Sequence, residues 1–408
     1  MHVQRSIQYT KAQMRDVSRG KIRVLCVGRD LRGGGATSVS LILLEHLDRS
    51  RFEISLFYLR DEGELRALVP ADLEPKFGAS NRQGSIRRLA PTLARLLNVA
   101  RESDVIFALQ NGRPLHFAIL VGGLARRPVV GWVHDCWSQW SYDLEPWHLW
   151  VAQHMYPHAD RLIAVSEGVA KELLDFVPRL RGKVVSVPSP LAVDQIRTRA
   201  QAGIPSWAEH IFDKRTVLAC GGLNCRKGFD VLLRAFAQLI HKLLDLHLLI
   251  LGEGKGRSSL ERLVDRLGLR DRVFMPGFQS NPYPFFTRAD VFVLSSRYEG
   301  LGMVLLEALC LGVPTVAVDC PHGPREILQD GRAGILVPPE NPIAMAEALR
   351  QVLCHKDLRE NLRAAGMQRA MDYEVTKVMP LFETLFLQCS EQGRLAKARP
   401  GKRDGTPQ

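Results

Sequence analysis

Residues 289–319 read ADVFVLSSRYEGLGMVLLEALCLGVPTVAVD, a run that places a strand, a turn, a helix and a second strand one after another. The first strand is expected over 289–296, the helix begins near Met303, and the second strand covers 313–319. Two glutamates, Glu299 and Glu307, interrupt this otherwise apolar run. Because a carboxylate taken out of water is costly without a partner, something polar is expected to meet them.

The same alternation of strand and helix fills most of the chain, and this predicts parallel sheets covered on both faces. It begins at residue 21, is interrupted by a less regular segment at 191–213, and then starts again. The strands are expected at 21–28, 52–59, 104–110, 128–135, 161–166 and 182–190, and then at 215–222, 246–254, 272–278, 289–296, 313–319 and 334–339.

The interruption indicates two doubly wound, Rossmann-like α/β domains, which are expected to face each other and hold a ligand at the carboxyl ends of their strands. The length of 408 residues agrees, since single cores rarely grow beyond ~250–300 residues. The expected boundaries are a flexible tail at 1–20, a first domain at 21–192, a linker at 193–213, a second domain at 214–370, a C-terminal helix at 371–390 and a disordered basic tail at 391–408.

Composition places the chain among ordinary globular proteins, with 46% hydrophobic and 24% charged residues. The first 21 residues lack the apolar core of a signal peptide, and no apolar run approaches the ~20 residues of a membrane-spanning helix. The eight cysteines show no CxxC pair and are expected to be reduced thiols. A cytoplasmic protein is therefore expected.

Two turns at strand ends carry the candidate chemistry. Gly300 and Gly302 allow close backbone approach before a helix whose free N–H groups form an anion site. The second turn, CGGLNCRKGFD at 220–230, brings Arg226 and Lys227 to the start of another helix. Taken singly, the alternatives are a structural ion pair for either glutamate and a solvated basic turn for the lysine. No Walker A loop and no GxGxxG after a strand are present, so a nicotinamide dehydrogenase is disfavoured.

Together these segments resemble the retaining glycosyltransferases of family 4 (GT4), which have the GT-B fold. The resemblance covers about residues 21–370, in order and with normal spacing. The motifs that carry it are GGGATSVSLILLEHL, VHD (133–135), AVSEGVAKEL (164–173), CGGLNCRKGFD, LGEG, VFMPGF, EGLGMVLLEALCLGVPTVA with its E-x7-E signature, and DCPHGPREILQDGRAGILVPP.

The resemblance implies a role for each matching residue. Glu299 is expected to contact hydroxyls of the donor sugar, and Glu307 to accept hydrogen bonds from the ribose. Lys227 is expected to neutralise the diphosphate, and His134 to face the reacting sugar. The remaining positions implied for donor binding are Gly34 and Gly35 at the phosphates, Phe278 and Gln279 at the nucleobase, and Gly300, Leu301, Gly302 and Met303 around the sugar and diphosphate.

One position departs from the family pattern. Gly222 occupies the place where relatives usually carry an arginine that shares the diphosphate charge. Arg226 is the candidate substitute. The implied reaction moves a sugar from a nucleoside diphosphate, most simply a UDP-sugar, to an acceptor hydroxyl with retention. Basic groups and amides are expected to replace a metal ion, and the sequence has no D-x-D cluster at a strand end.

The formal charge of +12 leaves the partner open between a phosphorylated substrate, an anionic membrane and nucleic acid. Nucleic-acid binding rests on charge alone and is disfavoured. Residues 85–102 form a basic amphipathic segment, with Ile86, Leu89, Leu93, Leu96, Leu97 and Ala100 on one face. This segment fits either peripheral contact with the inner face of the membrane or packing on the sheet.

Relatives often act on glycan or lipid-linked acceptors in lipopolysaccharide or other cell-surface glycan synthesis. Two further interpretations remain: an inactive partner subunit that binds a sugar nucleotide, which Gly222 favours, and a sugar-nucleotide epimerase of the same fold, which the E-x7-E signature opposes.

Overall fold

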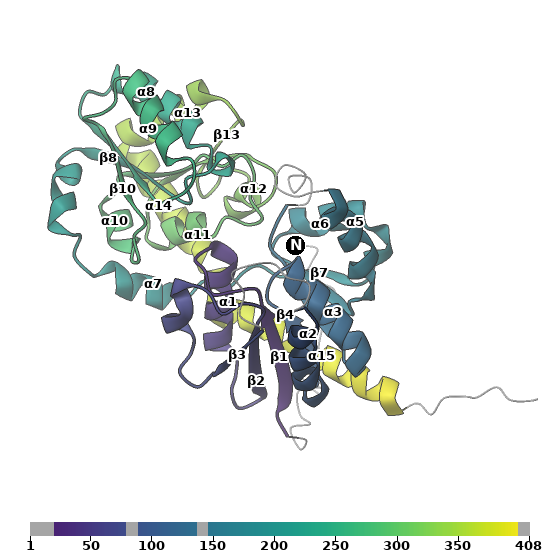
Figure 1. Cartoon of the computed structure of the whole chain (residues 1–408). Helices are drawn as coiled ribbons and strands as arrows, with labels where there is room; N and C mark the ends of the chain where they lie inside the picture. Colours follow the sequence, from purple (N-terminus) through teal and green to yellow (C-terminus); the bar gives the residue numbers. More distant parts are fainter. Residues whose placement is uncertain (1–19, 79–88, 137–145, 399–408) are drawn as a thin grey trace, which may run out of the picture. The chain divides into compact units, whose positions relative to one another are not determined.

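The computed structural model describes residues 20–78, 89–136 and 146–398 (Figure 1). The chain divides into two compact units. The first contains the chain up to Val165, then Val169–Val187 and everything from Val378 onward, while the second contains Ser166–Gly168 and Pro188–Lys377. Each unit has its own sheet.

The first unit is built on a seven-stranded parallel sheet with the order β3-β2-β1-β4-β5-β6-β7. The inner strand β1 pairs in parallel with β2 on one side and β4 on the other. Side chains of β1 alternate between two covered faces, which is why the strand is buried almost throughout. The strands are β1 (Ile22–Gly28), β2 (Phe52–Tyr58), β3 (Pro75–Phe77), β4 (Val105–Ala108), β5 (Val129–Val133), β6 (Arg161–Ala164) and β7 (Val184–Ser186).

Strand β3 is the one strand of this sheet that the sequence analysis did not predict. It is three residues long, begins at a proline and lacks a β-branched run. Proline is tolerated there because β3 lies at the edge of the sheet. The helices of the unit are α1 (Gly35–His46), α2 (Leu89–Glu102), α3 (Arg113–Ala125), α5 (Pro146–Met155) and α6 (Glu167–Phe176), with short 3-10 turns between them.

The last helix of the described residues, α15 (Val375–Ala398), belongs to the first unit from Val378 onward. Phe382 and Phe386 lie against the aromatic rings of the first sheet, with centroids 4.9 Å from Trp132 and 5.0 Å from Phe107. Glu383 accepts a hydrogen bond from Arg51, with N and O 2.8 Å apart. This packing explains why the helix continues past residue 390, where the sequence analysis expected a disordered tail. Residues 399–408 and the expected flexible tail at 1–19 lie outside the described residues.

The second unit has a six-stranded parallel sheet with the order β10-β9-β8-β11-β12-β13. Its strands are β8 (Arg215–Cys220), β9 (Leu246–Leu251), β10 (Val273–Gly277), β11 (Val291–Leu294), β12 (Thr315–Val318) and β13 (Ile335–Val337). Aliphatic side chains of β8, β9 and β11 form one buried cluster with α8 (Phe229–Ile240) and α13 (Pro342–Cys354). The other helices are α9 (Arg257–Arg266), α10 (Tyr283–Arg288), α11 (Met303–Cys310), α12 (Pro324–Ile327) and α14 (Lys356–Ala370).

The segment expected to be an irregular linker is folded as part of the second unit. It contains α7 (Val193–Ala200) and the 3-10 helix η7 (Ser206–Asp213). Gly203 and Pro205 separate these two elements and make the sequence look irregular, but Val193, Ile196 and Ile211 are buried on either side. The prediction of two doubly wound α/β domains is confirmed, and of the thirteen strands in the described part of the chain twelve lie near the expected ranges.

Two further features bear on the sequence analysis. Each of the eight cysteines is a free thiol. Among residues 20–78, 89–136 and 146–398, no helix combines the length and the apolar character that crossing a membrane requires.

Candidate functional site

The turn between β11 and α11 carries the first glutamate. Gly302 adopts a left-handed conformation with φ of 96° and caps α11, so a side chain at this position would be strained. The first turn of α11 contains no acidic residue, and its N-terminus has no side-chain cap. The free N–H groups therefore remain available to an anion.

Glu299 forms a buried ion pair with Lys227. The Lys227 Nζ lies 2.5 Å from Glu299 Oε1, and the Ser296 hydroxyl donates to the same oxygen at 2.7 Å. Only 5% of Glu299 is exposed. Burial would raise the pKa of Glu299, but Lys227 and Arg226 outweigh it and hold this pKa below its usual value. Glu299 is therefore ionised at neutral pH.

The turn that carries Lys227 is fixed to the end of β11. Gly228 has φ of 60°, and a Cβ there would lie 2.1 Å from the Ser295 carbonyl oxygen, so only glycine fits. The Ser295 hydroxyl donates to the Lys227 carbonyl at 2.7 Å. Arg297 donates to the Cys225 carbonyl at 2.6 Å and forms an ion pair with Asp230. These contacts hold Lys227 in place beside Glu299.

Arg226 and Gly222 occupy the same turn. The guanidinium of Arg226 lies 5.8 Å from the centre of the Tyr298 ring and contributes to lowering the pKa of Glu299. Arg226 is half-buried, and it lies close enough to Glu299 to stabilise the ionised carboxylate. Gly222 is exposed, with the Asn224 amide nitrogen 3.2 Å from where a Cβ would lie. The turn therefore offers two cations, Arg226 and Lys227, next to one buried carboxylate.

Glu307 is half-buried in α11, one helical turn beyond the cap. Burial raises its pKa to about 7, while Arg199 and the Tyr283 hydroxyl act in the opposite direction. The Tyr283 oxygen lies 3.5 Å from Glu307 Oε1, a long hydrogen bond. No stronger partner of Glu307 is found among the described residues, so its carboxylate has capacity for hydrogen bonds from a ligand.

The loop after β10 is tied to α7. Arg199 donates to the Ser280 carbonyl at 2.7 Å, and the Asn281 side chain donates to the Arg199 carbonyl at 2.8 Å. The Arg199 guanidinium also lies 4.9 Å from the centre of the Tyr283 ring. In this loop Phe278 is 63% exposed, and Gln279 is half-buried. An apolar ring exposed to this degree is free to stack on a planar ligand.

Tyr283, Arg199, Ser296 and Arg297 were not singled out from the sequence. The contacts of Tyr283, Arg199 and Arg297 join positions far apart in the chain, and Tyr283 and Arg199 lie in helical segments without a recognisable motif. Ser296 and Arg297 could have been noted because they lie at the strand end near Glu299. The groups that Arg297 contacts could not be predicted from the sequence.

The remaining predicted residues belong to the first unit. Gly34 caps α1, Gly35 is its first residue, and no side chain would be obstructed at either position. His134 follows β5, and its Nε2 donates to the Leu109 carbonyl at 3.0 Å, because a carbonyl oxygen can only accept. Burial lowers the pKa of His134 to about 4, with Asp135 opposing, so the imidazole is neutral at pH 7 and Nδ1 carries the lone pair.

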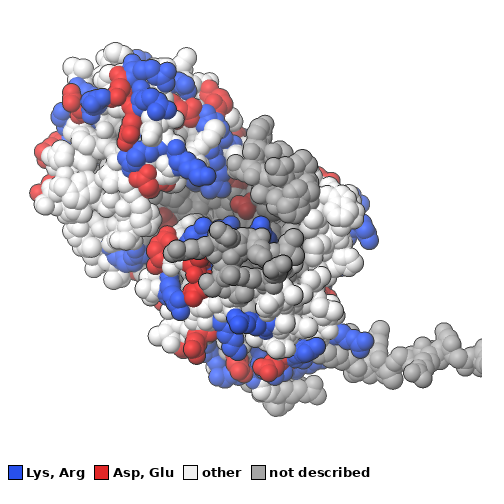
Figure 2. Space-filling view, in the orientation of Figure 1, with Lys and Arg blue, Asp and Glu red and all other residues white. Residues whose placement is uncertain are grey.

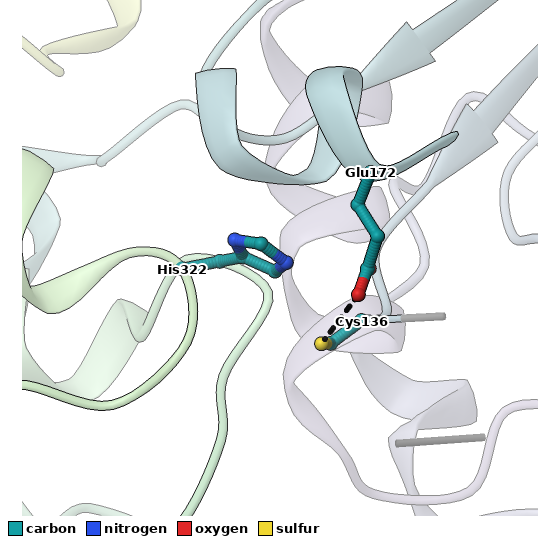
Figure 3. Close-up of side chains that lie close together, drawn as sticks. All are labelled: Cys136, Glu172 and His322. Atoms are coloured by element: carbon teal, nitrogen blue, oxygen red, sulfur yellow. Dashed lines mark hydrogen bonds between the residues drawn. The ribbon is translucent and has the colours of Figure 1, made fainter. Parts of the chain in front are cut away.

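A second polar contact of the first unit joins Cys136 to Glu172 (Figure 3). The thiol lies 3.5 Å from the Glu172 carboxylate and donates to it. His322, also drawn there, belongs to the second unit and has φ of 64°. No role is assigned to these three side chains.

Comparison with known proteins covers both units. Residues 33–195 match the model of glycosyltransferase family 4, and residues 207–369 match the model of glycosyl transferases group 1. The alpha-D-kanosaminyltransferase of Streptomyces kanamyceticus is 28% identical over 308 residues, which are 72% of this chain and 79% of that protein.

A second relative, from Campylobacter jejuni, is an N-acetylgalactosamine-N,N'-diacetylbacillosaminyl-diphospho-undecaprenol 4-alpha-N-acetylgalactosaminyltransferase. It is 29% identical over 224 residues, 55% of this chain and 59% of that protein. The chain spans about three fifths to four fifths of the length of such curated relatives.

Among solved structures, HepE of Anabaena in complex with UDP superimposes with a TM-score of 0.76 at 20% identity. The match covers 90% of this chain and all of that one. At this level of identity the likeness establishes the fold alone.

Proposed function

The chain belongs to the family 4 glycosyltransferases of GT-B fold, and we propose that it transfers a hexose from a UDP-sugar to an acceptor hydroxyl with retention of configuration. The observation that carries this proposal is the buried Lys227–Glu299 pair at the N-terminus of α11. A cation, a carboxylate and free amides there offer separate partners for the diphosphate and for sugar hydroxyls.

The diphosphate is assigned to Lys227, Arg226 and the amides of Gly300, Leu301, Gly302 and Met303. Negative charge on the diphosphate grows as the bond to the sugar breaks, and preorganised donors stabilise that charge without reorganising. The cations and amides supply this stabilisation, so the proposed mechanism uses no metal. Gly34 and Gly35 of the first unit are proposed to contact the phosphates, as the family resemblance implies.

The nucleoside is assigned to the segment around Glu307. Its carboxylate accepts from the ribose hydroxyls, and Phe278 and Gln279 contact the base. Support for uracil comes from HepE, whose solved structures contain UDP and UDP-glucose. Because Glu307 has a pKa of about 7 without ligand, nucleotide binding is expected to favour its ionised form and release a proton.

The sugar is assigned to Glu299 and His134. Glu299 is ionised and accepts hydrogen bonds from donor-sugar hydroxyls. His134 is neutral, and its fixed tautomer leaves Nδ1 to accept a hydrogen bond. Neither residue is assigned as a nucleophile, which agrees with a front-face route in which the departing phosphate and the acceptor share one side of the sugar.

The acceptor is proposed to be a lipid-linked glycan or a lipopolysaccharide precursor made in the cytoplasm. The support is the relative from Campylobacter jejuni, whose name specifies a diphospho-undecaprenol acceptor. The acceptor proposal is independent of the donor proposal.

A panel of nucleotides tests the donor assignment. A ligand at ~100 times its dissociation constant adds ~2.7 kcal/mol to the free energy of unfolding. We expect UDP and one UDP-sugar to raise the melting temperature, with smaller shifts for ADP, GDP and CDP. The Glu307→Ala variant should lose the shift, whereas the exposed Glu360→Ala variant should keep it. Equal shifts for all four nucleotides would contradict the uridine assignment.

A UDP-sugar that raises the melting temperature is then tested as the donor in a transfer assay. Incubation with the donor and a lipid extract should yield a glycosylated lipid whose anomeric configuration is read by NMR. Binding of UDP without transfer to any lipid or glycan would instead favour the inactive partner subunit, and free sugar without an acceptor would favour an epimerase.

A further inference from the structure

Two motifs of the second unit, LGEG at 251–254 and VFMPGF at 273–278, are joined by the side chain of Arg257. Its Nε lies 2.9 Å from each carboxylate oxygen of Glu253, and its Nη2 donates to Glu253 Oε2 at 2.6 Å. Its Nη1 donates to the Met275 carbonyl at 3.0 Å. One arginine therefore links the loop after β9 to strand β10.

This ion pair is better fixed than an ordinary pair on a helix surface, which is worth little. Glu253 precedes α9 and Arg257 is the first residue of that helix, so the pair does not lie along the helix. The Gly254 N–H also donates to Glu253 Oε1 at 3.0 Å. The hydrogen bonds from Arg257 and Gly254 lower the pKa of Glu253 to about 2. The pair is therefore charged and held in one geometry.

The pair lies beside Gly277, the last residue of β10. A Cβ on Gly277 would lie 3.6 Å from Glu253 Oε2 and 3.7 Å from Arg257 Nη2. The Gly252 N–H donates to the Gly277 carbonyl at 3.0 Å, which keeps the two strand ends together. Phe278, whose ring is 63% exposed, comes next in the chain. The pair and this ring therefore belong to the same edge of the sheet.

The strand order β10-β9-β8-β11 gives the direction of a bound nucleotide. The groups assigned to sugar and diphosphate, Glu299 and the turn of Lys227, follow β11 and β8. Glu253 and Phe278 follow β9 and β10, on the other side of β8. The Leu223 N–H donates to the Glu253 carbonyl at 3.0 Å and joins the two regions. A nucleotide with its diphosphate at β8 and β11 therefore extends its base over the ends of β9 and β10.

Charge alone does not distinguish this pair from its surroundings. Figure 2 shows basic and acidic side chains together over α8 and α9, and a mostly uncharged surface over α10. The distinguishing property is the remaining capacity for hydrogen bonds. A carboxylate accepts about four, and Glu253 accepts from three donors among the described residues. Arg257 Nη2 carries two N–H groups, and in the same part of the chain one of them has a partner.

We propose that Glu253 and Arg257 form hydrogen bonds with the edge of the nucleobase and select it, an inference that rests on the proposed nucleotide-binding function. Uracil presents the O4 acceptor beside the N3–H donor, which matches a guanidinium N–H beside a carboxylate oxygen. Cytosine and adenine present an amino donor beside a ring-nitrogen acceptor, the reverse order. Guanine presents O6 beside N1–H and matches as uracil does. The pair thus rejects cytosine and adenine but not guanine.

Calorimetric titration of the full chain with UDP, CDP, ADP and GDP tests this selection. The double variant Glu253→Gln with Arg257→Gln carries two amides, each of which can turn a donor or an acceptor toward the base. Its ratio of UDP affinity to CDP affinity should be roughly tenfold lower than that of the wild type. The ratio of UDP affinity to GDP affinity should change little. In the transfer assay kcat/KM for the donor should fall much more than kcat, because the base lies away from the bond that breaks.

A change in the ligand isolates the contact of Glu253. In 3-methyl-UDP a methyl group replaces the N3 hydrogen, so the wild type should bind it roughly tenfold more weakly than UDP. The single variant Glu253→Gln should show a smaller difference between the two ligands. Arg262→Gln is the matched control, because Arg262 is exposed on α9 and donates to the Ser259 hydroxyl. It should bind every ligand like the wild type, and circular dichroism confirms that all variants are folded.

Three outcomes would overturn the proposal: an unchanged ratio of UDP to CDP affinity in the double variant, an equal loss of affinity for all four nucleotides, or equal binding of UDP and 3-methyl-UDP by the wild type. The equal loss would leave the pair as a support of the strand ends. A wild type that prefers GDP, with a weaker preference over ADP in the double variant, would contradict the uridine assignment and support the role of the pair. A wild type that binds no nucleotide would overturn both proposals.

Discussion

Lys227 and Glu299 neutralise each other across 2.5 Å in the second unit, with both side chains largely buried. The cation assigned to the diphosphate and the carboxylate assigned to the sugar are therefore partners before any donor arrives. A bound donor offers each of them a new partner, phosphate for the lysine and sugar hydroxyls for the glutamate. The pair keeps both groups charged and positioned until then.

The first prediction separates the structural and the chemical roles of this pair. Lys227→Met should lower the free energy of unfolding by on the order of 3 kcal/mol, because it leaves Glu299 buried without its main counter-charge. Adding Glu299→Gln should restore most of the stability, since the uncompensated charge is gone. Turnover should stay low in both variants, and UDP affinity should fall less than turnover.

Urea unfolding and steady-state kinetics check this prediction. If the double variant also regained turnover, neither group would take part in the reaction. If Lys227→Met raised only the Michaelis constant, Lys227 would be a uniform binding contact.

The second prediction follows from the raised pKa of Glu307, which is about 7 against the ordinary 4.5. Below pH 4.5 this carboxyl is protonated in both the folded and the unfolded chain. Between pH 4.5 and 7 the unfolded chain ionises first, so the contribution of Glu307 to stability is lost as pH rises. Glu307→Gln should therefore become more stable than the wild type across this window, by at most about 3 kcal/mol above pH 7.

Thermal unfolding from pH 4 to pH 8 measures the difference. Glu360→Gln is the control, because Glu360 has a 63% exposed side chain and its pairing with Lys356 is solvated. A difference between Glu307→Gln and the wild type that does not change with pH would contradict the raised pKa.

The third prediction combines a substitution in the protein with a change in the ligand, in the manner of a double-mutant cycle. Glu307→Ala should weaken UDP binding by about 1.5–3 kcal/mol, the range for a hydrogen bond to a charged group. The same substitution should cost almost nothing for 2′,3′-dideoxy-UDP, which lacks the ribose donors. Calorimetric titration of both ligands gives the coupling.

Tyr283→Phe extends this test. Removing the hydroxyl withdraws a hydrogen bond to the Glu307 carboxylate, so the pH at which UDP affinity rises should move upward. If Glu307→Ala lowered the affinity for UDP and for its dideoxy form equally, Glu307 would have a structural role. The ribose hydroxyls would then be bound by another group.

The sequence predicted the fold well because its signals are local. Alternating apolar runs and turn glycines located every strand except β3, which is short and begins at a proline. The glutamates and Lys227 were found from their places at strand ends. The partners of Glu307 were not, because Tyr283 and Arg199 reach it only through the packing of α10 and α7 against the unit.

The amphipathic segment at 85–102 shows a different limit of prediction from sequence. Its amphipathic pattern is the same whether the apolar face meets a sheet or a membrane, and only the structure shows Leu96 and Ala100 buried. Periodicity identifies an apolar face but does not identify what covers it.

The last prediction concerns Arg226 and Gly222. A departing diphosphate in a site without a metal needs more than one cation, and the usual second one is missing at Gly222. Adjacent residues in a turn often point apart, which would leave Arg226 in solvent. In the structure Arg226 is half-buried, lies 5.8 Å from the centre of the Tyr298 ring and acts on the charge of Glu299.

We therefore expect Arg226→Ala to lower turnover by about tenfold to a hundredfold, the loss of one charge-assisted contact worth roughly 1.5–3 kcal/mol. Gly222→Arg in that background should restore part of it. Its backbone is not in the left-handed region, and a Cβ there would lie 3.2 Å from the Asn224 side-chain nitrogen, which can move, and 3.8 Å from the Glu253 carbonyl oxygen. Arg262→Ala is the control, because Arg262 is exposed on α9 and donates to the Ser259 hydroxyl there, away from this turn.

Transfer rates and UDP affinities are measured for Arg226→Ala, for the same variant with Gly222→Arg or Gly222→Gln added, and for the control. These values decide whether Arg226 supplies the second cation. Unchanged values in Arg226→Ala would leave Lys227 and the backbone amides as the only groups that hold the diphosphate. Rescue by Gly222→Arg, without rescue by Gly222→Gln, would show that a positive charge is required in this turn and that it can be supplied from either position.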